Sequence, residues 1–169
     1  PMIRLIRHKT VKEIYKIYTS SGIVTVTEDH SLLLSSLRCI SPKDIVINEH
    51  QLLFTDNIDE ISKRLYYQKE RWNGFYTQFE GKILFDPSVD EKYMAYIYLT
   101  FKKNFPGCVY MLRDSKYYLD LFNKQDIPEG LVLKIEKLGK INDFVYDIET
   151  TEGSFHCGTG SLIVKNTDS

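Results

Sequence analysis

Short segments that alternate apolar and polar residues, each next to a glycine or serine turn, occur at both ends of this 169-residue chain. In TSSGIVTVT, Val24 and Val26 alternate with threonines after a Ser-Ser-Gly turn. A period of two predicts a β-strand that is buried on one face, so residues 10–34 are expected to contain a hairpin. Residues 40–56 are predicted to form a strand, a turn and a second strand.

The same pattern returns near the end of the chain. Residues 131–135 and 144–148 each place alternate apolar residues on one face of a predicted strand, and a last strand is predicted over 162–164. Turns are expected between these strands, at 137–140, 152–154 and 158–160.

The middle of the chain has a different pattern. Apolar residues at helical spacing predict helices over 58–72 and 88–105, with Asp56 or Asn57 and Ser88 as their N-caps. Strand-like pieces lie between these helices and again over 108–122. The predicted fold class is therefore mainly β, with a mixed α/β insert in the middle.

Composition narrows the possible functions. The formal net charge is −1, and no apolar run is long enough to span a membrane, so neither a nucleic-acid partner nor a membrane is expected. The cysteines Cys39, Cys108 and Cys157 form no CxxC pair; we interpret them as packing residues, without a disulfide, metal or cofactor, in a reducing cytoplasmic setting. The chain has 12 Tyr, and its aromatics cluster in the middle, which favours core packing over base stacking.

Two patterns could carry chemistry within the β segments. Thr27 and His30 are separated by two residues at the end of a predicted strand, where a hydroxyl and an imidazole can both reach one backbone amide. Asp147 lies opposite the apolar face of its strand and could act as an acid or base in a cleft. The alternatives are an ordinary hydrogen-bonded histidine and a solvated carboxylate.

The end of the chain, LIVKNTDS, offers a third pattern. The Asn166 side chain can attack its own main-chain carbonyl and cut the chain if a rigid site aligns the two groups. Thr167 follows directly and is a nucleophile suited to acyl transfer. The alternative is an idle C-terminal tail.

Three segments in this order, TVTEDHSLL, VYDIET and GSLIVKNT, resemble the splicing motifs of inteins. The resemblance covers residues 10–56 and 128–169 and implies the horseshoe-shaped hedgehog/intein (HINT) fold. The final Thr-Asp-Ser resembles a metal-binding motif of family B DNA polymerases, which is a known point of intein insertion. Residues 167–169 would then belong to the host polymerase.

The resemblance also implies roles for single residues. Thr27 and His30 would activate the upstream scissile bond, and Asp147 would assist the acyl transfer. Thr167 would accept the acyl group, and Asn166 would cyclise to release the intein. Such a protein acts once and autocatalytically, so it is not a turnover enzyme, and it needs no cofactor.

Departures from the intein pattern refine this expectation. No Cys or Ser opens the chain, and Met2 behind Pro1 has the form of an initiator methionine. The resemblance therefore implies the C-terminal fragment of a split intein, whose partner is a short N-terminal fragment carrying the upstream polymerase segment. A variant intein class has Cys where Asp147 stands here, so this class is not indicated.

Two expected histidines are replaced. Lys165 precedes the terminal Asn, and Gly153 occupies the position of the late-motif histidine. Lysine donates hydrogen bonds but shuttles protons poorly near neutral pH. We hypothesise that His156, the nearest imidazole in the sequence, takes over part of the cyclisation chemistry.

The domain organisation implied by the resemblance is a β domain in two pieces, 2–56 and 128–166, around an insert at 57–127. Residues 90–122 resemble the closing part of a LAGLIDADG homing endonuclease, but no acidic LAGLIDADG-type helix is present, so no nuclease activity is expected. Two other functions remain open at this point: a β module that binds nucleic acid without splicing, and a hedgehog-like self-cleaving domain.

Overall fold

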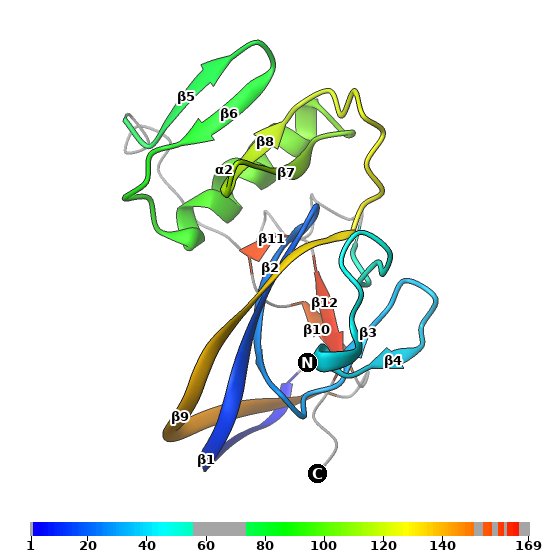
Figure 1. Cartoon of the computed structure of the whole chain (residues 1–169), viewed down its shortest axis with the longest axis vertical. Coiled ribbons are helices and arrows are strands. Elements are labelled where there is room, and N and C mark those ends of the chain that lie inside the picture. Colours follow the sequence, from blue (N-terminus) through cyan, green and yellow to red (C-terminus); the bar gives the residue numbers. More distant parts are fainter. Residues whose placement is uncertain (1, 56–73, 151–153, 157–158, 161, 166–169) are drawn as a thin grey trace.

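The computed structural model describes the backbone of most of the chain and the side chains of its larger part. Backbone is described for residues 2–55, 74–150, 154–156, 159–160 and 162–165, and side chains for 11–55, 74–140 and 162. Over these ranges the chain is mainly β, and all strand pairs are antiparallel. The prediction of a mainly β fold is confirmed. Figure 1 shows a terminal part, formed by both ends of the chain, and a middle part above it.

The terminal part is built around a four-stranded sheet in the order β11-β2-β1-β9. The predicted hairpin is present: β1 and β2 pair from Ile14–Thr27 to Thr19–Gly22. The first strand is longer than predicted, because β1 continues along β9 beyond the end of β2. The strands are β1 (Met2–Thr19), β2 (Gly22–Thr27), β9 (Val132–Thr150) and β11 (Thr159–Gly160).

The turn predicted over 137–140 is wrong, because β9 runs without a break from Val132 to Thr150. Ile14 pairs with Gly139 and Tyr15 pairs with Lys137, so Leu138 is an extra residue opposite β1. This is a β-bulge, with Gly139 at a φ of 91°. Gly139, which suggested a turn, therefore lies in the bulge instead. Figure 1 shows that the paired β1 and β9 are strongly bent.

Short strand pairs complete the terminal part. They are β3 (Leu32–Leu33) with β4 (Cys39–Ile40), and β10 (Ser154–His156) with β12 (Ile163–Lys165).

Two further predictions about the terminal part are corrected. The strand pair predicted over 40–56 is wrong: a 3-10 helix forms at Pro42–Asp44, and residues 51, 52 and 54 make only isolated bridges. Pro42 favours this helix because its fixed φ suits the first helical turn. The turn predicted at 158–160 is also wrong for its last two residues, since Thr159 and Gly160 pair with β2.

The middle part is a four-stranded sheet in the order β5-β6-β8-β7, with helix α2 packed on one face (Figure 1). Its strands are β5 (Tyr76–Phe79), β6 (Lys82–Phe85), β7 (Val109–Arg113) and β8 (Lys116–Asp120).

The helix predicted over 88–105 is confirmed as α2 (Glu91–Asn104), but the predicted N-cap is wrong. Asp90 is the N-cap and accepts a hydrogen bond of 3.0 Å from the backbone N–H of Lys92. Ser88 instead bonds to Asp86 within the preceding loop. The helix predicted over 58–72 lies outside the described residues.

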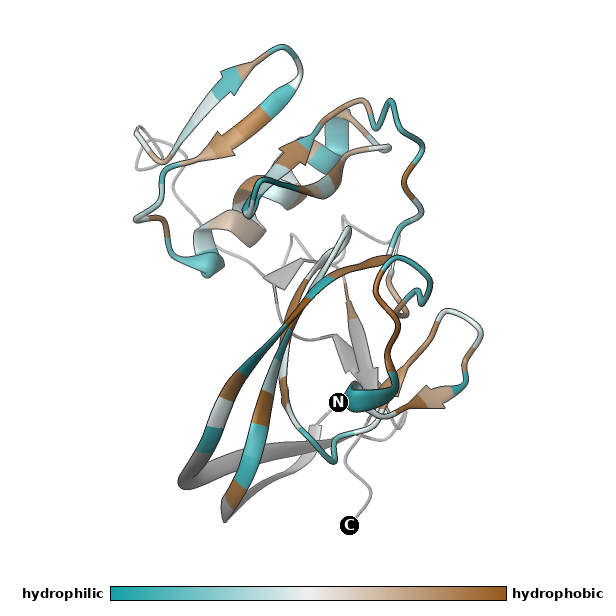
Figure 2. Ribbon diagram, in the orientation of Figure 1, coloured by the Kyte–Doolittle hydropathy of each residue, from teal (hydrophilic) through white to brown (hydrophobic). Residues whose placement is uncertain are grey.

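Each part has its own hydrophobic core. The core of the terminal part is largely aliphatic, with Ile17, Val24 and Val132 among its members. The core of the middle part contains stacked tyrosines, so the prediction that the aromatics serve packing is confirmed for these rings. Figure 2 shows hydrophobic and hydrophilic residues alternating along the described parts of β1 and β9, as expected for strands with one buried face.

The cysteine predictions have different outcomes. Cys108 is fully buried in the middle core, as predicted. Cys39 is exposed, so its interpretation as a packing residue is wrong. Cys157 lies outside the described residues. In the described part of the chain, no helix combines the length and the apolar character that crossing a membrane requires.

Candidate functional site

Thr27 and His30 lie at the two ends of one tight turn. Strand β2 ends at Thr27, and the backbone N–H of His30 donates a hydrogen bond of 3.1 Å to the carbonyl of Thr27. The two residues are thus the first and fourth of a β-turn, whose ends are close together. Both are half-buried, and the Nε2 atom of His30 is shielded from solvent. The turn therefore holds a hydroxyl-bearing and an imidazole-bearing residue close together along the backbone.

Asp29, inside the same turn, is a neighbour that sequence reasoning missed. The Thr27 hydroxyl donates to its Oδ1 at 3.0 Å, and Lys12 of β1 forms an ion pair with its Oδ2. The hydrogen bond from Lys12 lowers the pKa of the Asp29 carboxyl, and the bond from Thr27 lowers it further. A Thr-x-Asp spacing just after a strand is a signal for such a side-chain contact.

The turn is also tied to the neighbouring strands. The N–H of Glu28 donates to the carbonyl of Glu13 at 2.9 Å, and the Ser41 hydroxyl donates to the carbonyl of Glu28 at 3.4 Å. A Glu13 side-chain oxygen accepts from the N–H of Gly139 at 3.2 Å, next to the β9 bulge. The Thr27–His30 turn is therefore held against β1, the bulge and the 3-10 segment.

The backbone brings the end of the described chain close to the strand that follows this turn. Strand β3 begins two residues after His30, and β12, which ends at Lys165, lies close to β3. Leu32 of β3 and Leu162 pack in the same core. The structure thus places the residue before Asn166 beside the segment that follows His30. Asn166 and Thr167 themselves lie outside the described residues.

For Asp147, His156 and Lys165 only the backbone is described. Asp147 pairs with Ile6, whereas Thr27 pairs with Ile14 farther along β1, so strand pairing alone does not bring Asp147 to Thr27. His156 pairs with Ile163, and Lys165 pairs with Ser154, in the β10–β12 ribbon.

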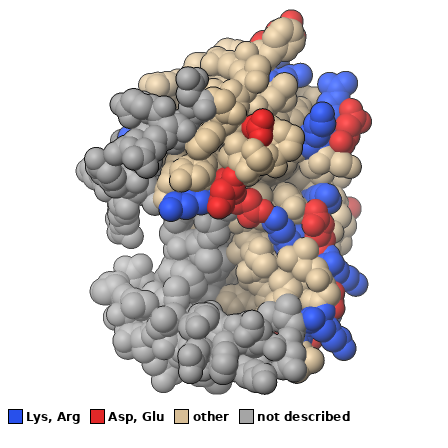
Figure 3. Space-filling view, turned by 90° about the vertical axis from the view of Figure 1, so that its left-hand side faces the viewer, with Lys and Arg blue, Asp and Glu red and all other residues tan. Residues whose placement is uncertain are grey.

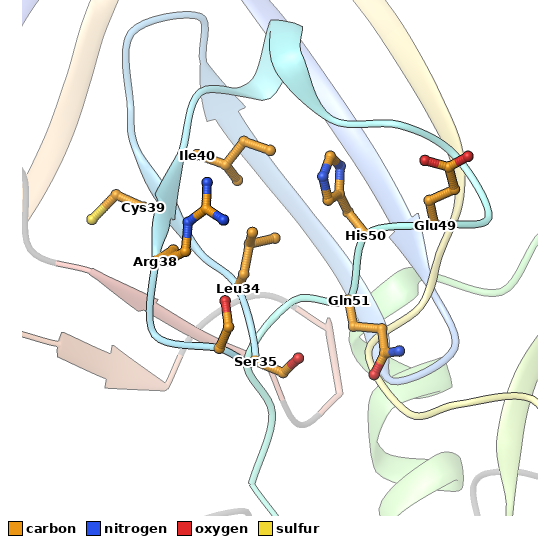
Figure 4. A pocket seen from close by; sticks show the side chains of 9 residues that line it. Leu34, Ser35, Arg38, Cys39, Ile40, Glu49, His50 and Gln51 are labelled. Atoms are coloured by element: carbon orange, nitrogen blue, oxygen red, sulfur yellow. The ribbon is translucent and has the colours of Figure 1, made fainter.

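A pocket of about 300 Å³ lies between the β3–β4 hairpin and residues 49–51. Figure 4 shows Arg38 and Cys39 on the hairpin side, with His50 and Gln51 on the other. The Nδ1 atom of His50 accepts a hydrogen bond of 2.8 Å from the N–H of Val46, which fixes the ring structurally. Neither Thr27 nor His30 lines this pocket, so we do not assign the proposed chemistry to it.

Charge on the described surface is mixed. Figure 3 shows lysine and arginine side chains interspersed with aspartate and glutamate on the face in view. Among the described residues, Lys134 pairs with Glu136 at 2.9 Å and Lys16 pairs with Glu91. Such a pattern does not favour the tracking of a phosphate backbone by this face. The described residues also contain no group of three metal-ligating side chains.

Comparisons with known proteins give two similarities. A DNA polymerase of Acanthamoeba polyphaga mimivirus is 56% identical over 39 residues, which are 23% of this chain and 2% of the polymerase. The crystal structure of the transcription factor IIB Mvu mini-intein matches 98% of this chain and 63% of the mini-intein chain, with a TM-score of 0.47 and 14% identity. No family model matches the chain. The similarity to the DNA polymerase therefore covers a short stretch of this chain and a very small part of the polymerase.

Proposed function

We propose that this chain carries out protein splicing, as the C-terminal fragment of an intein that interrupts a family B DNA polymerase. The observation that supports the proposal is the approach of β12, which ends at the residue before Asn166, to β3, which begins two residues after His30. Inteins need this proximity, because upstream activation and downstream release act on the two ends of one excised segment. The similarity to a mimivirus DNA polymerase agrees with a polymerase host.

The Thr27–His30 turn serves the first step. The side chain of the first intein residue attacks the preceding carbonyl carbon, the peptide C–N bond breaks, and an ester or thioester forms. His30 is suited to protonate the departing amine. Because its hydroxyl proton is donated to Asp29, Thr27 presents its oxygen lone pairs, which can accept the N–H of the scissile peptide.

The next two steps use the end of the chain. The Thr167 hydroxyl attacks the ester or thioester carbonyl and takes over the acyl group, while Asp147 assists by accepting the hydroxyl proton. The side-chain oxygen or sulfur of the first intein residue leaves and takes up a proton. The Asn166 side-chain nitrogen then attacks its own main-chain carbonyl carbon, which breaks the bond to Thr167 and closes a succinimide. An oxygen-to-nitrogen acyl shift at Thr167 restores a peptide bond between the flanking segments.

We propose that a separate short N-terminal fragment supplies the opening nucleophile. This makes the reaction a trans-splicing reaction, with polymerase segments on both sides. The β strands of the terminal part would pair with strands of that fragment, as exposed strand edges commonly do.

Substitution of Asn166 tests the proposal and separates it from a hedgehog-like mechanism. With the N-terminal fragment present, Asn166→Ala should stop release at Thr167 and accumulate the branched ester intermediate, detected by mass spectrometry as a hydroxylamine-sensitive species. Unchanged cleavage in Asn166→Ala would support the hedgehog-like alternative. Salt-dependent DNA binding without any cleavage would support the nucleic-acid-binding module.

His156 and Lys165 are proposed to replace the missing histidines during cyclisation. With C-terminal cleavage followed separately from acyl transfer, His156→Ala should slow cleavage by about tenfold or more, which is less than the ~10²–10⁴-fold of a complete general acid–base group because His156 takes over only part of this chemistry. Lys165→Met tests the hydrogen bond that the lysine would donate to the Asn166 carbonyl. Unchanged cleavage in both variants would remove these two residues from the mechanism.

A further inference from the structure

The turn that joins β1 to β2 is buried, although hairpin turns normally face solvent. Thr19, Ser20 and Ser21 all have 0% of their surface exposed. The Thr19 hydroxyl donates to the carbonyl of Gly22 at 2.9 Å and accepts from the N–H of Ser21 at 3.1 Å, which closes the turn internally. The remaining polar groups of a buried turn must find partners in neighbouring segments.

The first such segment is the chain that returns from the middle part into β9. Ser20 makes three hydrogen bonds to it: its N–H donates to the carbonyl of Leu131 at 3.0 Å, its hydroxyl donates to the carbonyl of Pro128 at 2.6 Å, and its Oγ accepts from the N–H of Leu131 at 3.1 Å. The Ser21 Oγ accepts from the N–H of Gly130 at 2.8 Å. These bonds join the turn to residues 128–131, which we call the return segment. Both backbone and side-chain groups of the turn take part.

The second segment is the β7–β8 hairpin of the middle part. The N–H of Tyr110 donates to the carbonyl of Ser20 at 2.8 Å, and the Tyr117 hydroxyl donates to the carbonyl of Thr19. The Tyr117 ring also meets the edge of Tyr18 of β1, with ring centroids 5.5 Å apart. The middle part therefore contacts the β1–β2 hairpin directly as well as through the connecting chain.

Tyr117 is held rigidly for this contact. Its ring stacks on Tyr110 with centroids 4.5 Å apart and planes at 9°, and Tyr110 stacks in turn on Tyr98 of α2 at 4.7 Å. Burial raises the pKa of Tyr117 well above its usual value, so its hydroxyl keeps the proton that it donates. The stack links α2, β7 and β8 to the carbonyl of Thr19.

We propose that the middle part is a clamp for the splicing site, with Tyr117 as a positioning residue that fixes the buried end of the six-residue strand β2. Strand register set at Gly22 determines where Thr27, at the other end, meets its substrate. The middle part would then be needed for efficient splicing by the terminal part, and would not be a dispensable insert. This inference rests on the proposed splicing function and extends it to the role of the middle part.

The test uses Tyr117→Phe in the full chain, mixed with a saturating amount of the N-terminal fragment. Cleavage of the upstream bond by hydroxylamine or thiol reports the first step alone. We expect its rate to fall about fivefold to tenfold, in line with the loss of one buried hydrogen bond. The affinity for the N-terminal fragment should change less than this rate.

Two controls separate positioning from general destabilisation. Tyr118→Phe removes a hydroxyl from the next residue of β8, whose ring packs in another cluster with Val109 and Met111. Ile97→Val weakens the core of the middle part and keeps the Tyr117 hydroxyl in place. Both should retain the wild-type first-step rate. If Ile97→Val lowers the rate as much as Tyr117→Phe at an equal loss of thermal stability, the positioning role is overturned.

Hydrogen exchange keeps this inference testable if the chain does not splice. Tyr117→Phe should speed amide exchange in residues 22–27 and leave residues 32–40 unchanged, whether or not a product forms. Unchanged exchange in both segments would refute the clamp. Absence of product with the wild-type chain would refute the splicing function alone.

Discussion

The two ends of strand β2 lie in opposite environments. At the Gly22 end, three consecutive residues are completely buried, and hydrogen bonds tie the turn to both the return segment and the β7–β8 hairpin. At the Thr27 end, the strand leads into a half-buried turn in which Asp29 is exposed. Strand β2 thus runs from a buried end at Gly22 to an open end at Thr27.

The stabilising contacts and the proposed site residue Thr27 therefore lie at opposite ends of the same strand, β2. A turn that receives a substrate peptide, as we propose for Thr27–His30, must keep one side open, so burial on all sides cannot fix it. We infer that the buried end of β2 adds to the rigidity that the hydrogen bonds of the turn provide. Substitutions at the buried end should therefore cost mainly stability, and those at the open end mainly activity.

The largest effect is expected for Gly130→Ala, at the buried end. A Cβ atom at this position would lie 2.1 Å from the carbonyl oxygen of Leu52, and the φ of Gly130 is +78°. Relief requires movement of backbone that is hydrogen-bonded to Leu52, so we expect a loss of at least ~3 kcal/mol in the free energy of unfolding. Urea denaturation of the full chain measures it.

Gly107→Ala is the matched control, because a Cβ there meets no atom within 4 Å. It should change the free energy of unfolding by less than about 0.5 kcal/mol. Similar stability of the two variants would show that the buried end is not fixed in the way described.

A smaller effect is expected for Ser21→Ala. The substitution leaves the N–H of Gly130 without the acceptor that the Ser21 Oγ provides, in a site closed to water. The expected cost is about 1–3 kcal/mol in the free energy of unfolding, measured by urea denaturation. Ser36→Ala, at an exposed position, should cost almost nothing. A loss below that of Ser36→Ala would contradict the importance of this contact.

The smallest effect on stability is expected at the open end, for Asp29→Asn. The pair of Lys12 and Asp29 is exposed, so its loss should cost less than about 0.5 kcal/mol. The first-step rate should fall more clearly, because an asparagine at this position has no charge to hold the Thr27 hydroxyl proton. Hydroxylamine cleavage measures the rate, and Asp44→Asn at another exposed position is the control.

The contribution of Asp29 to the free energy of unfolding should depend on pH in a predictable direction. The pKa of Asp29 is lowered in the folded chain from its ordinary value of 3.8, so its stabilising effect is present above that pH. It is lost as the pH falls through the folded-state pKa. The stability difference between wild type and Asp29→Asn should therefore be larger at pH 7 than in acid, where it should shrink towards zero. A difference that grows in acid would contradict the assignment.

Local patterns predicted most of the individual elements. The Val24–Val26 alternation predicted β2, and the helical spacing in the middle predicted α2. The β9 bulge was mistaken for a turn, because a glycine with positive φ serves both structures. The pairing of β1 with β9, which are far apart in the sequence, determines that a bulge forms here and not a turn. Local sequence patterns do not contain this information.

The candidate site was predictable only in part. Thr27 and His30 were identified from their spacing, and the structure places them in one turn. The partners of the turn were missed, since Lys12 reaches Asp29 from another strand and its role depends on strand register. The burial of Ser20 and Ser21 was missed for the same reason: a Ser-Ser-Gly turn has the composition of an exposed hairpin loop.

The most direct test of the account is a mixing experiment. The full chain, extended at Thr167-Asp168-Ser169 by further polymerase sequence, is combined with a short N-terminal intein fragment that carries the upstream polymerase segment. Intact-mass measurement should then find the two polymerase segments joined by a peptide bond and a released fragment ending in a succinimide at Asn166. Only unreacted starting polypeptides, after stable association of the two fragments has been verified, would contradict the account.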